Sequence, residues 1–194
     1  MSFLYLADNV VPKEIFNLAH QEIYYGSIWT MTNTSHIGDT NNGFGAIGYC
    51  EKINKSIREG KFNEMHIIFN LWNAINSKVK IEKKFKNVLK KVHINCGPPL
   101  FDQTVHTDEE DNIAFSKDIT VLFFIHELWN HGWGGEFLLY DLEKTKVIAG
   151  TFPMPNRVAV FEAYLPHRGV TVSRICPIMR VSVAFQCKFD NTLK

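Results

Sequence analysis

Ten residues near the end of the chain, Arg180 to Phe189, alternate between apolar and other side chains with unusual regularity. The apolar positions are Val181, Val183, Phe185, Cys187 and Phe189. Successive side chains of a β-strand point to opposite faces of the sheet, so this alternation predicts a strand with one face in the core. Arg180, Ser182 and Ala184 share the opposite face.

Strand-like segments, each bounded by turn residues, make up most of the chain from residue 88 onward. They are Val92 to Asn95, Gln103 to Asp108, Ile119 to Glu127, Gly134 to Asp141, Arg157 to Phe161 and Gly169 to Ser173. Many short strands with turn signals between them indicate a barrel or a sandwich.

The first 87 residues are more mixed. Pro12 to Tyr25 and Phe62 to Ser77 have apolar residues at helical spacing, which predicts two helices, the second with an apolar face that packs on a sheet. Met1 to Asp8 and Trp29 to Thr34 are predicted as strands. We therefore expect a mainly β chain of the α+β class. It is a single domain over residues 1–194, in which 1–87 form a helical and loop support and 88–189 the β core.

The composition limits the classes of function. With 194 residues and 45% hydrophobic content, the chain can bury a full core, and its net charge of +1 gives no general reason to bind nucleic acid or a membrane. The four cysteines have no CxxC spacing, and the N-terminus has no basic leader, so we expect reduced thiols and a cytoplasmic location. The lysine-rich segment from Lys78 to Lys91 has interleaved apolar residues, which favours a solvated face over a nucleic-acid surface.

His106-Thr107-Asp108 and His167 are the candidate metal ligands. On a strand His106 and Asp108 point to the same face, and the predicted sandwich brings His167 beside them. Two imidazoles and one carboxylate, with half of the coordination sphere open, form the facial triad of non-haem Fe(II) oxygenases. A metalloprotease site is excluded, because His126 and His131 are five residues apart and a zincin helix needs a spacing of four.

Two further segments accompany these residues. Trp129 to Asp141 is similar to the tryptophan-rich turn and GGE strand of the prolyl-4-hydroxylase-like branch of the Fe(II)/2-oxoglutarate-dependent dioxygenases, and Pro155 to Phe161 resembles the strand before its distal histidine. The resemblance covers roughly residues 88 to 189. It implies a double-stranded β-helix, that is, a cupin-like jelly roll, with the N-terminal helices packed on one sheet.

The resemblance also implies the cofactors and their ligands. His106, Asp108 and His167 would bind Fe(II), and Arg180 with Ser182 would bind the distal carboxylate of 2-oxoglutarate. Asn95 is expected near the co-substrate, and ascorbate is a candidate stimulant. Arg174 competes with Arg180 for the carboxylate, and Phe124 and Phe137 stand where the family has pocket-lining residues.

The resemblance implies C–H hydroxylation with release of succinate and CO2, but the substrate stays open between a peptidyl, prolyl-like group and a small molecule. Acidic residues 109–111 could select a cationic substrate. The rival functions are a cupin-like protein that holds metal without turnover, and a nucleic-acid repair dioxygenase. The oligomeric state is not indicated. The segment Thr34 to Gly48, with four glycines, is predicted as a loop, either a lid over the iron or a passive surface excursion.

Overall fold

Two antiparallel sheets and a pair of helices form the molecule. The computed structural model describes residues 4–26, 30–33, 43–50, 65–79, 87–101, 103–108 and 118–189. The strands are β1 (Tyr5–Asp8), β2 (Thr30–Asn33), β3 (Gly43–Cys50), β4 (Asn87–Gly97), β5 (Ile119–Phe124), β6 (Phe137–Tyr140), β7 (Val147–Thr151), β8 (Arg157–Glu162), β9 (His167–Gly169) and β10 (Arg180–Phe189). The helices are α1 (Lys13–Ala19), continued by a π-helix over His20–Tyr25, α3 (Met65–Val79), and a 3-10 turn over His131–Trp133.

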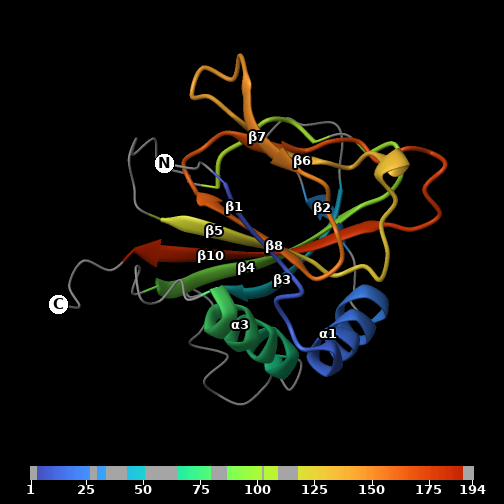
Figure 1. Ribbon diagram of the computed structural model, residues 1–194, viewed down its shortest axis with the longest axis vertical. Coiled ribbons are helices and arrows are strands. Elements are labelled where there is room, and N and C mark those ends of the chain that lie inside the picture. Colours follow the sequence, from blue (N-terminus) through green and yellow to red (C-terminus); the bar gives the residue numbers. More distant parts are fainter. Residues whose placement is uncertain are drawn as a thin grey trace.

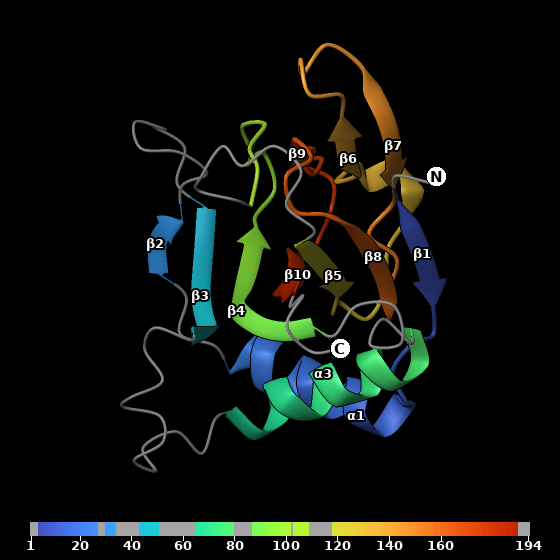
Figure 2. The same ribbon diagram turned by 90° about the vertical axis from the view of Figure 1, so that its left-hand side faces the viewer.

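The larger sheet has the order β1-β8-β5-β10-β4-β3-β2, and the smaller one β7-β6-β9. The large sheet lies between two layers, with α1 and α3 on one side and the small sheet on the other (Figure 1). Figure 2 shows both helices side by side beneath the strands. The expectation of a mainly β chain with N-terminal helices on one sheet is confirmed. Within the described ranges, no helix is long and apolar enough to cross a bilayer.

The core between the helices and the large sheet follows the alternation of the strands. Val181, Val183 and Phe185 of β10 point toward the helices, where Trp72 of α3 packs on Phe185 with ring centroids 5.1 Å apart. Burial of each such side chain contributes about 1.5–3 kcal/mol. The opposite face of the large sheet meets the small one through a second cluster: Leu122, Phe124, Phe137, Leu139, Ala159, Phe161, Leu165 and Ala184. The predicted two-faced character of β10 is therefore confirmed.

Three predictions about single segments need correction, and one strand was not predicted. Residues 103–108 form no strand, and only His106 makes an isolated bridge. The strand expected over 169–173 begins and ends earlier, as β9, and β7 was not anticipated. Residues 43–48 belong to β3, which is hydrogen-bonded to β4, so this half of the predicted loop is not free to act as a lid. Residues 34–42 lie outside the described part, as do 62–64 of the predicted helix.

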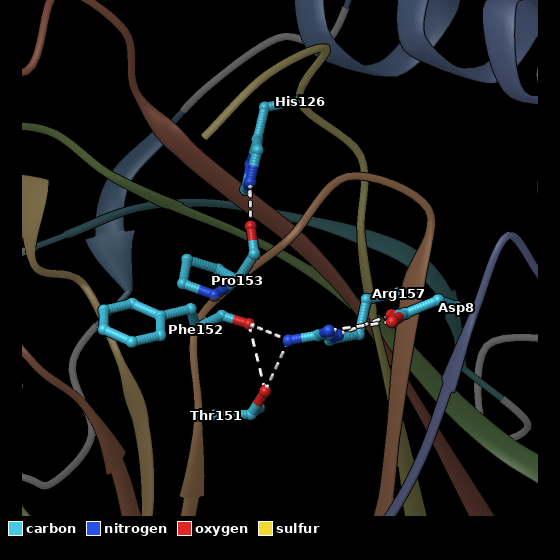
Figure 3. A network of polar contacts seen from close by, with 6 residues as sticks. All are labelled: Asp8, His126, Thr151, Phe152, Pro153 and Arg157. Carbon is cyan, nitrogen blue, oxygen red and sulfur yellow. Dashed lines mark hydrogen bonds and ion pairs between the residues drawn. The ribbon is translucent and has the colours of Figure 1, made fainter. Parts of the chain in front are cut away.

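The N-terminal strand is held at the sheet edge by a network of polar contacts (Figure 3). β1 pairs with β8, and Arg157 of β8 donates to both carboxylate oxygens of Asp8, at 2.6 and 2.8 Å. Its remaining amino group donates to Thr151 Oγ1 at 3.0 Å and to the Phe152 carbonyl at 3.3 Å. The Arg157 guanidinium lowers the pKa of Asp8, chiefly through the hydrogen bond. This arginine thus joins the N-terminal strand to the segment that connects β7 of the small sheet with β8 of the large one.

His126 lies in the same region and is fully buried. Its Nε2 is hydrogen-bonded to the Pro153 carbonyl (Figure 3), and its Nδ1 has no hydrogen-bond partner. Its ring packs at a tilt against Trp129, with the ring centroids 4.5 Å apart. Burial lowers the pKa of His126 to about 4. The folded protein therefore holds this imidazole neutral.

We predict that His126 makes folding sensitive to mild acid. The unfolded chain binds a proton at this histidine below about pH 6.5, but the folded chain only below about pH 4, so the free energy of unfolding falls as the pH drops through that window. The contribution is on the order of 2–3 kcal/mol. His126→Gln keeps a donor for Pro153 and should flatten the slope of urea-unfolding free energy between pH 7 and 4.5. His131→Gln, at an exposed histidine, is the control, and an unchanged slope in His126→Gln would contradict the assignment.

Candidate metal centre and its cavity

Two backbone hydrogen bonds bring the candidate ligands together. His106 N–H donates to the His167 carbonyl at 3.0 Å, and His167 N–H donates back to His106 at 2.8 Å. Asp108 N–H donates to Ala163 at 3.1 Å, which fixes the carboxylate beside the start of β9. One ligand atom from each of His106, Asp108 and His167 lies within 4.8 Å of the others. The predicted triad is thus a cluster that can hold a metal ion.

The backbone also orients both imidazoles. His106 Nδ1 lies 3.0 Å from the Thr104 carbonyl, and His167 Nδ1 lies 2.9 Å from the Leu165 carbonyl. A carbonyl only accepts, so each Nδ1 carries the proton and each Nε2 keeps its lone pair. This is the arrangement that metal-binding histidines usually have. Phe161 packs edge-on against the His167 ring at 4.8 Å and restricts its rotation.

Asp108 is held in the ionised form. Burial acts to raise the pKa of this carboxyl group, but the neighbouring His167 and His106 and a hydrogen bond from Thr120 outweigh it, and the net pKa is lowered. Thr120 Oγ1 donates to Asp108 Oδ2 at 2.5 Å. Thr120 therefore orients the carboxylate, whose Oδ2 also lies 3.8 Å from His167 Nε2.

The triad opens into a cavity of about 250 Å3 between the two sheets. Its floor is the face of the large sheet that the helices do not cover. Its polar lining contains all six predicted site residues: Asn95, His106, Asp108, His167, Arg180 and Ser182. Asn95 and Ser182 are opposite each other in the pairing of β4 with β10. Phe137 also lines the cavity, whereas Phe124 does not, and Arg174 is exposed in the loop before β10.

Arg180 is a buried cation with a relative exposure of 5%. Its Nη1 donates to the Gly135 carbonyl at 3.2 Å and its Nη2 to Gln103 Oε1 at 3.3 Å, both neutral acceptors. Burial lowers the pKa of Arg180 to about 10, so the guanidinium still carries its charge at neutral pH. Among the described residues no carboxylate forms an ion pair with it.

The tryptophan-rich turn explains how the guanidinium is held. Trp129 Nε1 donates to the Gly134 carbonyl at 3.1 Å, and Gly134 and Gly135 both have positive φ, 69° and 75°. A Cβ on Gly135 would lie 2.8 Å from the Trp129 ring, and a Cβ on Gly169 would lie 2.0 Å from Arg180 Nη2. Only glycine allows the guanidinium to lie this close to the backbone.

Several lining residues were not anticipated from the sequence. Thr120, Gln103, Lys91, His93 and Gln186 line the cavity, and burial lowers the pKa of His93 to about 4. The alternation of β4, β5 and β10 assigns four of them to the cavity face once the sheet order is known. Gln103 lies outside any strand, and no signal in the sequence marks it.

Solved structures share this fold. A prolyl hydroxylase from Trichoplax adhaerens, in complex with a hypoxia inducible factor oxygen degradation domain peptide fragment, is 16% identical, with a TM-score of 0.69 over 98% of this chain and 84% of that one. A 2OG-Fe(II) oxygenase family oxidoreductase from Burkholderia pseudomallei is 15% identical, with a TM-score of 0.68 over 96% and 85%. The chain has the fold of a prolyl-4-hydroxylase-like 2-oxoglutarate oxygenase.

A third structure carries the co-substrate. The viral collagen prolyl hydroxylase of Paramecium Bursaria Chlorella virus-1, in its 2OG complex, is 13% identical, with a TM-score of 0.61 over 96% of both chains. No protein-family model matches this chain, and no curated protein matches it in sequence. The resemblance stated from the motifs is therefore confirmed by structure.

We predict that Thr120 supports metal binding through Asp108. Thr120→Val removes the hydroxyl with little change in shape and should weaken Mn(II) binding by about 10- to 100-fold, as for other partners of metal ligands. The measurement is a calorimetric titration. Thr145→Val, which removes an exposed hydroxyl bonded to Asp141, is the matched control. Equal affinity in the two variants would contradict the role of Thr120.

Proposed function

We propose that this protein is an Fe(II)- and 2-oxoglutarate-dependent dioxygenase on a double-stranded β-helix, and that it hydroxylates a C–H bond of its substrate. The observation that carries the proposal is the buried charge of Arg180. Among the described residues no carboxylate forms an ion pair with this guanidinium, and Glu136 acts on it only through longer-range electrostatics. Arg180 lines the same cavity as the triad of His106, Asp108 and His167. A buried cation is costly without a counter-charge, and a bound carboxylate supplies one.

The donor set fits iron. Two neutral imidazole Nε2 atoms and one ionised carboxylate suit Fe(II), and the set lacks the thiolates of most structural zinc sites. The three ligands would leave the cavity side of the metal open. Because a carboxylate occupies the Asp108 position, where related halogenases have a small residue and bind chloride, the expected outcome is oxygen insertion.

The co-substrate fits the other end of the cavity. Arg180 would bind the distal carboxylate of 2-oxoglutarate through charge-assisted hydrogen bonds, with Ser182 as a second donor and Asn95 beside it. Iron and 2-oxoglutarate, when bound, supply the oxidative decarboxylation to succinate and CO2 and the oxidation of the substrate. The chain itself holds the ligands, orients the carboxylate, and excludes bulk water with Leu122, Phe137 and Phe161.

The rival functions have less support. A protein that only stores metal needs no cation such as Arg180 buried beside the metal. A nucleic-acid enzyme would rest on the lysine-rich segment, of which residues 80–86 lie outside the described part. A hypoxia-inducible-factor peptide is bound to the Trichoplax protein. For this chain, a peptide and a small molecule both remain substrate classes within the proposal.

The triad is tested by removing each ligand. His106→Ala, Asp108→Ala and His167→Ala should each abolish stoichiometric Mn(II) binding and decarboxylation of labelled 2-oxoglutarate, because each removes one of only three protein ligands. Circular dichroism checks that the variants remain folded. Decarboxylation at the parent rate in all three variants would disprove the site.

The carboxylate clamp is tested with the two competing arginines. Arg180→Ala should weaken 2-oxoglutarate binding to the Mn(II)-loaded protein by roughly one to three orders of magnitude, since loss of a buried charged partner costs about 2–5 kcal/mol. Mn(II) binding itself should be nearly unchanged. Arg174→Ala removes an exposed arginine of the preceding loop and should have little effect. The opposite ranking would move the clamp to Arg174.

A further inference from the structure

The cavity has a second cationic end, formed by Lys91 and Gln186. Pairing of β4 with β10 places Lys91 directly opposite Gln186, and both line the cavity. Arg180 is six residues from Gln186 on the same face of β10, a separation of about 20 Å along a strand. The two positively charged side chains therefore mark opposite ends of one cavity.

The triad lies between these ends. Gln186 is paired on its other side with Thr120, the residue that donates to Asp108. The Arg180 guanidinium lies against Gly169, two residues after His167 on β9. If 2-oxoglutarate extends from Arg180 to the metal, as the proposed function requires, it fills one half of the cavity. Lys91 and Gln186 then face the half that is left for the substrate.

The chemistry of that half is polar. Lys91 is half-buried, and among the residues that the structure describes no carboxylate lies within ion-pair distance of it. Thr120 and Gln186 are the polar lining residues paired beside it, whereas the apolar lining residues are Leu122, Phe137 and Phe161. The whole cavity, about 250 Å3, is smaller than the roughly 300–1,000 Å3 of sites that enclose drug-sized ligands.

We propose that the substrate is a small anionic molecule, whose carboxylate or phosphate group binds Lys91 and Gln186 so that a carbon a few bonds away lies beside the metal. This inference rests on the proposed function and narrows its substrate class. The ammonium group of Lys91 is a flexible point charge that can bind either a carboxylate or a phosphate. The acidic residues 109–111 would instead favour a cationic substrate, and the experiment below distinguishes an anionic from a cationic substrate.

The test uses protein loaded with Mn(II) and saturating 2-oxoglutarate. The 2-oxoglutarate occupies the Arg180 end of the cavity, and Mn(II) in place of Fe(II) prevents turnover. The probes are sets of small compounds that share a carbon skeleton and carry a carboxylate, a phosphate ester, a neutral carboxamide or an amine. Ligand-observed NMR measures their binding. Carboxylic acids or phosphate esters should bind more tightly than the amides. The ratio of the affinities of the carboxylates and the phosphate esters then identifies which anion the site prefers.

Three variants assign the preference. Lys91→Met should weaken binding of the anionic probes by about tenfold or more, and Lys91→Glu should shift the preference toward amines. Lys188→Met removes the same charge from an exposed position on β10 outside the cavity and should change nothing. Affinity for 2-oxoglutarate should be equal in all three variants, because Arg180 is intact.

Each contrary result has a distinct meaning. The inference is overturned if the anionic probes bind no better than the amides, or if they do not bind at all. It is also overturned if they bind to Lys91→Met as tightly as to the parent protein. A parent preference for amines overturns it in favour of the acidic segment. If the parent protein fails to bind 2-oxoglutarate with Mn(II), the proposed function itself is wrong, and this is measured before any probe is added.

Discussion

The guanidinium of Arg180 lies between two packed sheets, where an unpaired charge is expensive, and the surrounding backbone is shaped to hold it. The Gly135 carbonyl and Gln103 accept two of its hydrogen bonds, and Gly169 has no side chain where the guanidinium lies. Gly135 has a positive φ, and a Cβ at this position would collide with the ring of Trp129. A segment that looks like a surface turn in the sequence therefore serves to orient one buried charge.

This arrangement depends on the central position of β10. The strand pairs with β4 on one side and β5 on the other, so it is hydrogen-bonded along both edges. Its apolar face is fixed by packing on α1 and α3, and a slip of one residue would move Val183 into the cavity and Ser182 into the core. The helices contribute no lining residue, yet their packing determines which side chains of β10 face the cavity and its candidate metal ligands.

The sequence predicted those features that depend on local periodicity. The alternation of β10 placed Arg180 and Ser182 on one face, and the HxD motif with the distal histidine identified the triad. Features that depend on pairing between strands were not predictable in the same way. Thr120 is a polar residue in an otherwise apolar strand, and its role becomes apparent only from the pairing of β5 with β10. Gln103 contacts Arg180 from a segment without regular structure. The frequent glycines of residues 43–48 predict a loop, but hydrogen-bonded pairing with β4 makes this segment a strand.

The charges of the cavity connect the co-substrate to the substrate. Arg180, Lys91 and a divalent metal would bring four positive charges into a space where Asp108 supplies a single negative one. As metal ligands the two histidines would add no charge, because each would bind the metal through the Nε2 lone pair while its Nδ1–H donates a hydrogen bond to a carbonyl. A dianionic co-substrate leaves one positive charge uncompensated, and it lies at the Lys91 end, far from the clamp. In a partly enclosed site, where charges interact more strongly than in water, an anionic substrate would supply the missing negative charge.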